Sequence, residues 1–469
     1  MNYRFRECTL DQPLLMAPSL QEWLPENHLA RFIGDVTEQL DLAKIYSAYG
    51  RRDGRGQVGY HPVLLTRLLL YGYAVGVASS RGIERKTYDD VAFRYLAADQ
   101  HPDHDTIAAF RQQHLEALAG LFTQALQLCR KAGLIKLGHV AIDGSKLQAN
   151  ASKHKAMSYG RITETEQRLR AEVEELLRRA QETDAAEDLQ YGKGKQGDEL
   201  PEELARRESR LKKIKEAKAA LEAEAREDAE KKKAAAEAKV AERRAQEDRT
   251  GKRPGGRDPK IPDPATAVPE EKAQRNFTDP ESRIMPDGSH KGSFVQGFNA
   301  QIAVDSGAQI IVAAEITQES NDKRQLAPML EKVERNMGSK PAAASADTGY
   351  FSADQVTDER VQGIELYVAI GKQKHGDSEG GGMALEANPE PEDSERERMK
   401  RKLQTEQGKA IYKMRKAIVE PVFGQIKEWR RFRRFSLRSL KKAGAEWKLI
   451  CLTHNLLKLF RSGWIPQAA

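Results

Sequence analysis

The sequence predicts an α/β fold in which a mixed sheet is joined to an all-α N-terminal domain and interrupted by a long helical insertion. Three observations predict it. Apolar residues recur every three or four positions through 1–135, and short apolar runs alternate with helical patterns between 138 and 370. An insertion of about 150 residues, rich in Glu, Lys, Arg and Ala, separates the first apolar run from the second. The 469 residues exceed the ~250–300 at which a single core usually stops growing, so we expect two or three domains.

The composition narrows the class of protein. Hydrophobic residues are 39% and charged residues 31%, which indicates that part of the chain is solvated helix. A net charge of +7 permits a nucleic-acid partner but does not by itself indicate one. The cysteines Cys8, Cys129 and Cys451 are far apart, so neither a disulfide framework nor a zinc site is indicated. No signal peptide and no apolar stretch of ~20 residues is found, so we expect a cytoplasmic protein without membrane contact.

The N-terminal domain, 1–135, is predicted to be helical from the apolar periods in 62–75 and 107–128. Pro62 fits a first helical turn, where its missing N–H costs nothing. Residues 81–111 hold helical patterns broken by Pro102 and several basic side chains. Two interpretations of this stretch stay open: a helix-turn-helix that binds DNA, and plain helical packing.

The central domain is predicted over 136–150 and 276–460. Strands are expected at 139–142, where the run stops in a turn at 143–145, and at 298–304, 310–316, 342–346 and 365–370. Helices are expected at 323–336, near 352–360 and over 396–460. The sequence Asp305-Ser306-Gly307 between the second and third strands signals a hairpin. Residues 371–395, with three consecutive glycines, are predicted to form a flexible loop.

The insertion, 151–275, is predicted to be a helical hairpin or coiled coil followed by a linker over 251–275. Its helical stretches, 161–180 and 201–247, are separated by a Gly-rich break. The second stretch carries a heptad seam made of Leu204, Leu211, Ile214, Leu221 and Ala225. Arg207 and Lys218 interrupt that seam. Such a seam more often packs within its own chain than against a partner, although an exposed part could pair subunits.

Two aspartates end apolar strands in the central domain. Asp143 and Asp347 each follow a run of small or apolar residues, and a glycine comes directly after Asp143 and two residues after Asp347. Either one alone would as readily cap a turn. Because the carboxyl ends of neighbouring strands converge on one crevice, the pair is predicted to reach a common metal ion. From spacing alone Asp322 competes as a ligand, whereas Asp305 is better explained by its hairpin.

Glu420 is the predicted third acid. It lies between Val419 and Val422 on an expected helix, where a lone buried carboxylate would be costly. A cation shared with other carboxylates removes that cost. Mg²⁺ prefers such hard oxygen ligands, and two ions ~3.5–4 Å apart can promote in-line displacement at phosphorus. The predicted metal-holding and catalytic residues are therefore Asp143, Asp347 and Glu420.

A basic segment follows the third acid. Residues 427–442 hold eight basic side chains and one acid. The net charge of this segment alone equals the +7 of the whole chain. Aromatic side chains lie between them and could stack on unpaired bases. We predict DNA contact rather than a merely solvated surface. The residues expected to take part are Lys427, Trp429, Arg430, Arg431, Arg433 and Arg434.

Four motifs occur in a fixed order: 141–146 around Asp143, 296–301, 346–350 around Asp347, and 419–424 around Glu420. In this order and combination they resemble bacterial insertion-sequence transposases of the DDE, RNase H-like kind, over nearly the whole chain. The resemblance implies an RNase H-like core and two Mg²⁺ ions, for which Mn²⁺ can substitute. It also implies hydrolysis and transesterification of double-stranded DNA at inverted-repeat ends and at a target. A homodimer or higher oligomer on DNA, in the bacterial cytoplasm, is expected with it.

The third-acid helix of that family carries Tyr, Arg, Glu and Lys, matched here by Tyr412, Arg415, Glu420 and Lys427. Four residues separate Arg415 from Glu420, where three are commonest, so Lys416 is an alternative to Arg415.

Other classes fit less well. A tyrosine recombinase needs a C-terminal H-x-x-R and a tyrosine, and the sole H-x-x-R, 28–31, is in the wrong half. A catalytically silent DNA-binding regulator derived from a transposase would be recognised by loss of a carboxylate. All three predicted acids are present, so the sequence favours an active enzyme.

Overall fold

The computed structural model describes residues 19–49, 59–191, 202–251, 259–287, 292–371 and 394–466. The chain divides into two compact units, Met1–Leu147 with Asn299–Ala469, and Gln148–Phe298. The predicted flexible loop, 371–395, lies almost wholly outside the described residues, as do the break at 192–201 and Cys8.

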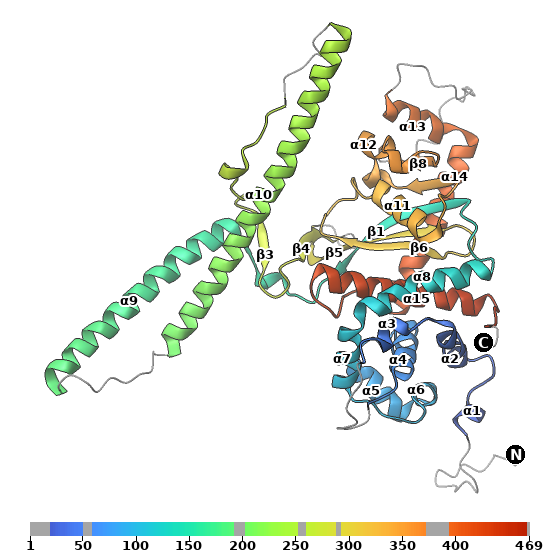
Figure 1. Ribbon diagram of the computed structural model, residues 1–469, viewed down its shortest axis with the longest axis horizontal. Helices are drawn as coiled ribbons and strands as arrows, with labels where there is room; N and C mark the ends of the chain where they lie inside the picture. The colour runs from blue at the N-terminus through green and yellow to red at the C-terminus, as the bar shows by residue number, and fades with distance from the viewer. Residues whose placement is uncertain are drawn as a thin grey trace, which may run out of the picture. The chain divides into compact units, whose positions relative to one another are not determined.

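The first unit is built on a mixed sheet (Figure 1). Its strands are β1 (His139–Gln148), β5 (Phe294–Asp305), β6 (Ile311–Thr317), β7 (Ala343–Ala346) and β8 (Glu365–Val368). They lie in the order β5-β1-β7-β8, and β6 pairs with β5. The pair β5 and β6 is antiparallel, whereas β7 is parallel to both β1 and β8. This confirms the predicted mixed α/β core of the RNase H-like kind.

The β5–β6 hairpin forms where the sequence predicted it. Asp305 is fully buried, and its Oδ1 accepts a hydrogen bond from the Gly307 N–H at 2.9 Å. Its Oδ2 accepts from the Leu137 N–H at 2.7 Å and the Lys136 N–H at 3.3 Å. Both carboxylate oxygens are satisfied by backbone donors, so Asp305 is a structural hairpin residue, as expected.

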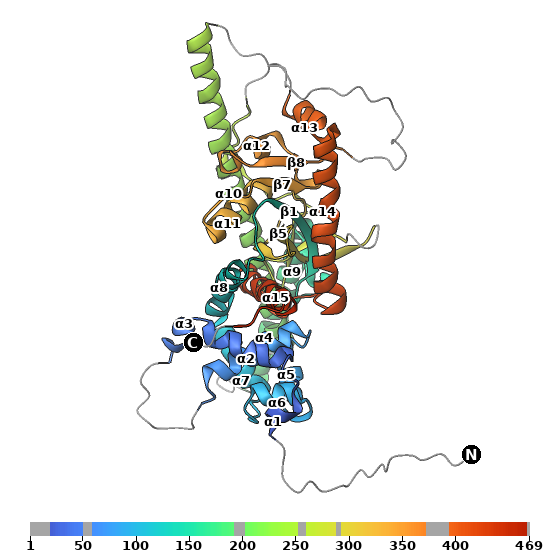
Figure 2. The same cartoon turned by 90° about the vertical axis from the view of Figure 1, so that its right-hand side faces the viewer.

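Helices cover both faces of the sheet. They are α11 (Leu326–Met337), α13 (Glu395–Gln404), α14 (Glu406–Gly424) and α15 (Leu440–Arg461). Figure 2 shows the sheet between α11 on one side and α14 on the other. Helices α11 and α15 contact β6, and α14 contacts β7 and β8. Two strands of the sheet therefore lie directly against the helix that carries Glu420.

The predicted continuous helix over 396–460 is wrong in its middle. Helix α14 passes into a π-helical turn, Gln425–Trp429, and residues 430–439 are not helical. Arg431 and Ser439 have positive φ values of 61° and 77°, which an α-helix does not allow. The basic segment is therefore an irregular stretch between two helices.

The N-terminal helices belong to the same unit. They are α1 (Leu20–Trp23), α2 (Leu29–Gln39), α3 (Ala43–Tyr46), α4 (Pro62–Ala74), α5 (Ser80–Asp89), α6 (Val91–Leu96), α7 (His104–Gln113) and α8 (Leu115–Lys131). Pro62 begins α4, as predicted. Helices α4 and α8 pack along α15, so segments from opposite ends of the sequence share one core (Figure 1).

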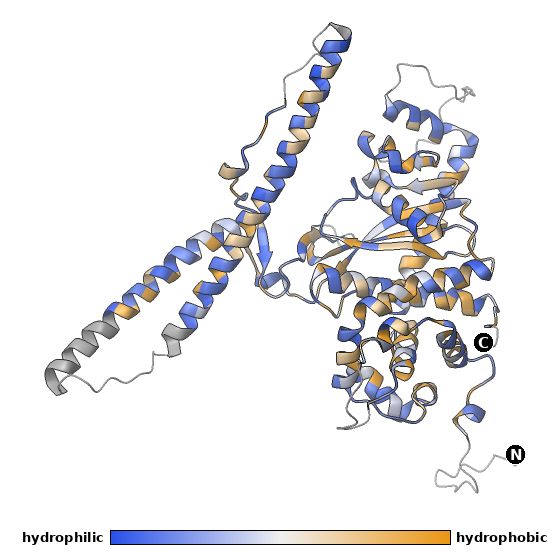
Figure 3. Cartoon of the chain, in the orientation of Figure 1, coloured by the Kyte–Doolittle hydropathy of each residue, from blue (hydrophilic) through white to orange (hydrophobic). Residues whose placement is uncertain are grey.

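The second unit contains the predicted helical hairpin, α9 (Tyr159–Tyr191) and α10 (Glu202–Thr250). Ile162, Leu169 and Val173 of α9 pack against a row on α10. That row consists of Leu211, Ile214, Ala217 and Leu221. Three residues of the predicted seam, Leu211, Ile214 and Leu221, are therefore used within the chain, whereas the side chain of Leu204 lies outside the described part. The hydropathy colouring in Figure 3 shows the remaining faces of both helices as mainly hydrophilic.

The two charged residues that interrupt the seam have partners across it. Lys218 Nζ lies 2.8 Å from Glu166, and Arg207 Nε lies 3.4 Å from Glu172. Each cation meets an acid of α9, so the interruptions select this pairing of helices rather than weaken it.

Three short strands were not predicted. β2 (Ala156–Ser158) and β3 (Gln274–Asn276) pair with each other beside the hairpin, and β4 (Arg283–Pro286) pairs with the first part of β5. No helix among the described residues is long and apolar enough to cross a membrane.

Candidate active site

Asp143 lies on β1, and Asp347 is the residue directly after the neighbouring parallel strand β7. The strands pair up to Ala141 opposite Ser345, and each aspartate follows its member of that pair by two residues. Asp347 caps a short 3-10 turn, and its charge raises the pKa of Asp143, so the two carboxylates lie within electrostatic reach of each other. The structure thus brings together the two acids that the sequence placed at strand ends, although about 200 residues separate them in the chain.

The surroundings of both carboxylates disfavour their ionised forms and raise their pKa values. Burial, with the charges of Asp347 and Asp322, raises the pKa of Asp143 to about 6, and the Arg415 guanidinium partly opposes this. Burial also raises the pKa of Asp347, against a hydrogen bond of 2.9 Å from the Gly349 N–H to its Oδ1. A cation between these groups would relieve the penalty.

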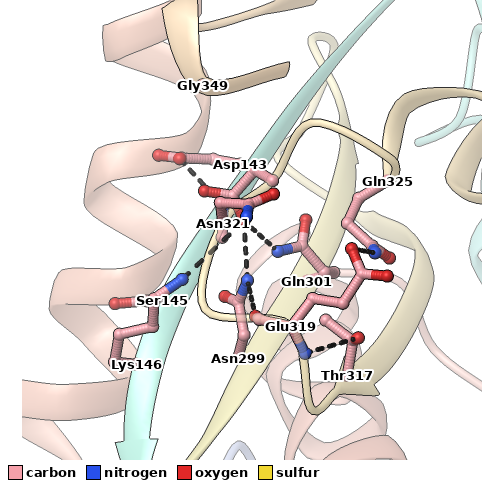
Figure 4. A network of polar contacts seen from close by, with 12 residues as sticks. Asp143, Ser145, Lys146, Asn299, Gln301, Thr317, Glu319, Asn321, Gln325 and Gly349 are labelled. Atoms are coloured by element: carbon pink, nitrogen blue, oxygen red, sulfur yellow. Dashed lines mark hydrogen bonds and ion pairs between the residues drawn. The ribbon is translucent and has the colours of Figure 1, made fainter. Parts of the chain in front are cut away.

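Asp322, the competing ligand from the sequence, lies beside this pair. Its Oδ1 accepts hydrogen bonds of 2.7 Å from both Asn299 Nδ2 and Gln301 Nε2, and Lys146 Nζ is 3.8 Å away. Figure 4 shows Asn299, Gln301 and Lys146 among the side chains of this polar network, together with Asp143. Asn299 and Gln301 are alternate residues of β5 and therefore share a face.

Gln301 is itself fixed from two directions. The buried Tyr350 hydroxyl donates to Gln301 Oε1, and Trp447 Nε1 donates to the Gln301 carbonyl oxygen at 3.1 Å. Burial keeps the Tyr350 pKa well above its usual value, so the hydroxyl remains a donor. The position of Asp322 is thus determined by a chain of buried hydrogen bonds.

Gly144 allows this network to approach β1. A Cβ added there would overlap the Gln301 amide nitrogen and lie 2.9 Å from Asp322 Oδ1. Any other residue would push the β5 amides away from the strand that carries Asp143. The roles of Asn299 and Gln301 were missed from the sequence. The available signal was the alternation of two amide side chains inside an apolar strand.

Helix α14 brings basic side chains to β1. Arg415 is buried, lies 3.7 Å from Asp143 Oδ2 and 5.7 Å from the centre of the Tyr412 ring. Lys427 Nζ donates to the Ser145 hydroxyl and, at 3.3 Å, to the Lys146 carbonyl oxygen. Arg415, rather than the exposed Lys416, is therefore the basic residue of α14 at the carboxylates.

Glu420 differs from its prediction in one respect. Its side chain is exposed, whereas Val419 and Val422 are buried, because successive residues of a helix are about 100° apart. The prediction that Glu420 is a buried carboxylate is therefore wrong. Among the described residues Glu420 has no recorded ion pair, and no three acidic, His or Cys side chains already form a metal cluster. It lies on α14 between Arg415 and Lys427, both of which contact β1.

Arg430 does not lie on the surface, which corrects its prediction as a DNA contact. It is 1% exposed and donates to the Ile450 carbonyl oxygen at 3.1 Å and to Thr453 Oγ1 at 2.8 Å. Burial lowers its pKa to about 10. The turn out of the helix sends this side chain into the core beside α15.

The other members of the basic segment fall into two groups. Phe432 and Phe435 are buried and cannot stack on bases, whereas Trp429 is 58% exposed with Arg461 over its ring at 5.5 Å. The exposed arginines are Arg431, Arg433, Arg434 and Arg438. Arg433 pairs with Glu428. Buried aromatic and exposed basic residues thus give the irregular stretch an inner and an outer side.

Two family models match the chain. The family described as "Transposase DDE domain" matches residues 265–456, and the family described as "Transposase domain (DUF772)" matches residues 18–113. No curated protein and no solved structure matches it. The first match contains Asp347 and Glu420 and begins after Asp143, beyond most of the helical insertion. Both models describe transposases, and together they span more than half of the residues. The chain belongs to the insertion-sequence transposases of the DDE type.

Proposed function

We propose that the protein binds the ends of its insertion sequence, cuts the DNA strand there and transfers the 3′ end to a target. Asp143, Asp347 and Glu420 are the proposed metal-holding residues, with two Mg²⁺ ions or Mn²⁺ in their place. The observation that carries the proposal is the approach of Asp143 on β1 and Asp347 at the end of the adjacent parallel strand β7. A cation beside them would relieve the penalty that raises both pKa values.

The donor set suits a hard divalent cation, because the groups available are carboxylate and amide oxygens. Such ions supply activation of the attacking oxygen and neutralisation of the leaving oxygen in phosphoryl transfer. The chain's own part is to orient these groups. The Gly349 N–H holds one oxygen of Asp347, and Arg415 offsets the charge of Asp143.

DNA contact is proposed for two surfaces that continue from the carboxylates. Tyr412 and Arg415 on α14, and Lys427 on the π-helical turn that follows it, lie next to β1, where a phosphate held by the cations would lie. Beyond them come Trp429 and the exposed arginines Arg431, Arg433 and Arg434. Arg430 is left out because it is buried. Two copies of the chain are proposed to hold the two ends.

The test uses oligonucleotides carrying the inverted repeats that flank the coding sequence. Asp143→Asn, Asp347→Asn and Glu420→Gln are each expected to lower Mg²⁺-dependent cleavage by more than about 100-fold while end binding is retained. Asp354→Asn, an exposed acid of α12 (Ala353–Val356), is the matched control and should cleave normally. Full activity in any of the three variants would remove that residue from the site.

A second outcome addresses the regulator alternative. A wild-type protein that binds the ends but cuts them with neither Mg²⁺ nor Mn²⁺ would be a silent DNA-binding protein. The close pairing of Asp143 and Asp347 favours the enzyme, because a protein released from catalysis has no need to hold two destabilised acids together.

A further inference from the structure

We propose that Asp322 is a fourth acidic residue of this site, whose Oδ2 accepts hydrogen bonds from the water shell of the divalent ions held by Asp143 and Asp347. The inference rests on the proposed metal-dependent function and adds a positioning residue to it.

The first step is the unequal use of the two oxygens of Asp322. Oδ1 receives two amide hydrogen bonds of 2.7 Å, from Asn299 and Gln301, and lies 3.8 Å from Lys146 Nζ. Among the described residues no donor is recorded for Oδ2. One oxygen thus fixes the orientation of the carboxylate and leaves the other available.

The second step is the direction of the available oxygen. A Cβ added at Gly349 would lie 3.5 Å from Asp322 Oδ2 and 3.1 Å from Asp347 Oδ1. The two carboxylates therefore approach the same glycine from different segments. The charge of Asp322 also contributes to the raised pKa values of Asp143 and Asp347, which places all three acids within electrostatic reach.

A separate observation, at Asn299, also indicates that a ligand binds here. Asn299 is 0% exposed, and its Oδ1 has no hydrogen-bond partner among the described residues. This oxygen would lie 3.0 Å from a Cβ at Gly144, next to Asp143. Buried polar atoms without partners are rare in native proteins and commonly mark a bound water or ion. A hydrated cation would satisfy this oxygen together with Asp322 Oδ2.

Asp305 shows what a purely structural acid looks like in the same sheet. Both of its oxygens accept backbone hydrogen bonds, from Gly307 on one side and Leu137 on the other. Asp322 has donors on one oxygen only, and its other oxygen lies toward Asp347 at Gly349. Because Oδ1 is already engaged by two amides, contact of Oδ2 with coordinated water fits this geometry better than direct ligation by the whole carboxylate.

The experiment measures Mn²⁺ binding to the full-length protein without DNA, by calorimetry and by the loss of the free Mn²⁺ electron paramagnetic resonance signal. Asp322→Asn keeps an oxygen for Asn299 and Gln301 and replaces only Oδ2 by an amide nitrogen. We expect the Kd for Mn²⁺ to rise about 10-fold to 100-fold, with the metal-free unfolding midpoint unchanged or higher. Asp354→Asn should leave both quantities unchanged. Asp305→Asn should lower the midpoint and leave the Kd for Mn²⁺ unchanged.

The outcomes separate the two proposals. If the wild type binds no Mn²⁺, or Asp143→Asn binds it as tightly as the wild type, the proposed metal site itself fails. If Asp143→Asn weakens binding and Asp322→Asn does not, only the role of Asp322 is overturned. The unfolding midpoint could instead fall in Asp322→Asn as it does in Asp305→Asn, while the folded protein keeps its affinity for Mn²⁺. That result would also overturn the role of Asp322 and make it a structural acid.

Discussion

Glu446 joins the N-terminal helices to the basic segment, and its removal should destabilise the first unit strongly. The side chain is 1% exposed. Its Oε1 accepts from the Tyr73 hydroxyl at 3.1 Å, and its Oε2 accepts from the N–H groups of Ser436 and Leu437 at 2.9 and 3.0 Å. Arg111 Nη1 donates to the Tyr73 oxygen at 3.2 Å. Burial and the charge of Glu446 raise the pKa of Tyr73, so its hydroxyl stays protonated.

Glu446→Ala would leave three donors without this acceptor, of which the Tyr73 hydroxyl and the Leu437 N–H are buried. A buried donor left without a partner costs about 1–3 kcal/mol, whereas the N–H of the exposed Ser436 can bond to water. We therefore expect a loss of roughly 3–5 kcal/mol in the free energy of unfolding. For a unit of this size about 2 °C is lost per kcal/mol, which gives a fall in the unfolding midpoint of roughly 6–10 °C. Glu446→Gln keeps one oxygen for the two N–H groups and should lose much less.

The assay is thermal unfolding followed by circular dichroism, combined with hydrogen exchange at the amides of Ser436 and Leu437. The control is Glu428→Ala, which removes an exposed acid of the same segment together with its surface ion pair to Arg433. Such a pair contributes about 0–1 kcal/mol. If Glu446→Ala melts within 2 °C of Glu428→Ala, the buried carboxylate does not hold the segment, and the reasoning is refuted.

Two further predictions concern charge. Without metal at pH 8, Asp143→Asn should be more stable than the wild type by up to about 3 kcal/mol, because the native pKa of about 6 lies above the usual 3.8. Above pH 6 the ionised Asp143 destabilises the wild type. This penalty disappears as the pH falls to about 4, where the thermal midpoints of the wild type and of Asp143→Asn should become equal. Equal midpoints at pH 8 would contradict it. For DNA binding, alanine at Arg431, Arg433 and Arg434 should reduce the slope of log Kd against log salt by about 0.9 per lost phosphate contact. Arg430→Ala should leave that slope unchanged and lower the unfolding midpoint, and an unaltered slope in the triple variant would make the segment an ordinary solvated surface.

The parts of the fold that were predictable from the sequence depend on local signals. The strands around Asp143 and Asp347 are short apolar runs ended by turn residues, and the β5–β6 hairpin follows from Asp305 and Gly307. The meeting of the two acids followed from the rule for parallel strands, because the insertion adds sequence separation without altering their register. The hairpin seam was visible for the same reason, since heptad spacing is local.

Exposure was predicted wrongly for Glu420 and for Arg430, for two different reasons. Val419 and Val422 suggested that Glu420 is buried, but the neighbours of a residue in sequence lie on other faces of its helix. Arg430 looked like every other arginine of its segment. The π-helical turn and the positive φ of Arg431 turn it inward, and neither is encoded by composition or periodicity.

Asp305 and Asp322 show why the site could be only partly assigned from residue types. Both are aspartates near strand ends of the same sheet, and the sequence offered turn context for the first and mere spacing for the second. The distinction becomes physical once each oxygen is considered separately. Asp305 has donors on both oxygens and so completes a hairpin. Asp322 has donors on one oxygen, faces Asp347 across Gly349, and is held by amides that only Gly144 allows so close to β1. A carboxylate fixed through one oxygen, with its other oxygen directed toward a second acid, is placed to accept hydrogen bonds from the water around a bound cation.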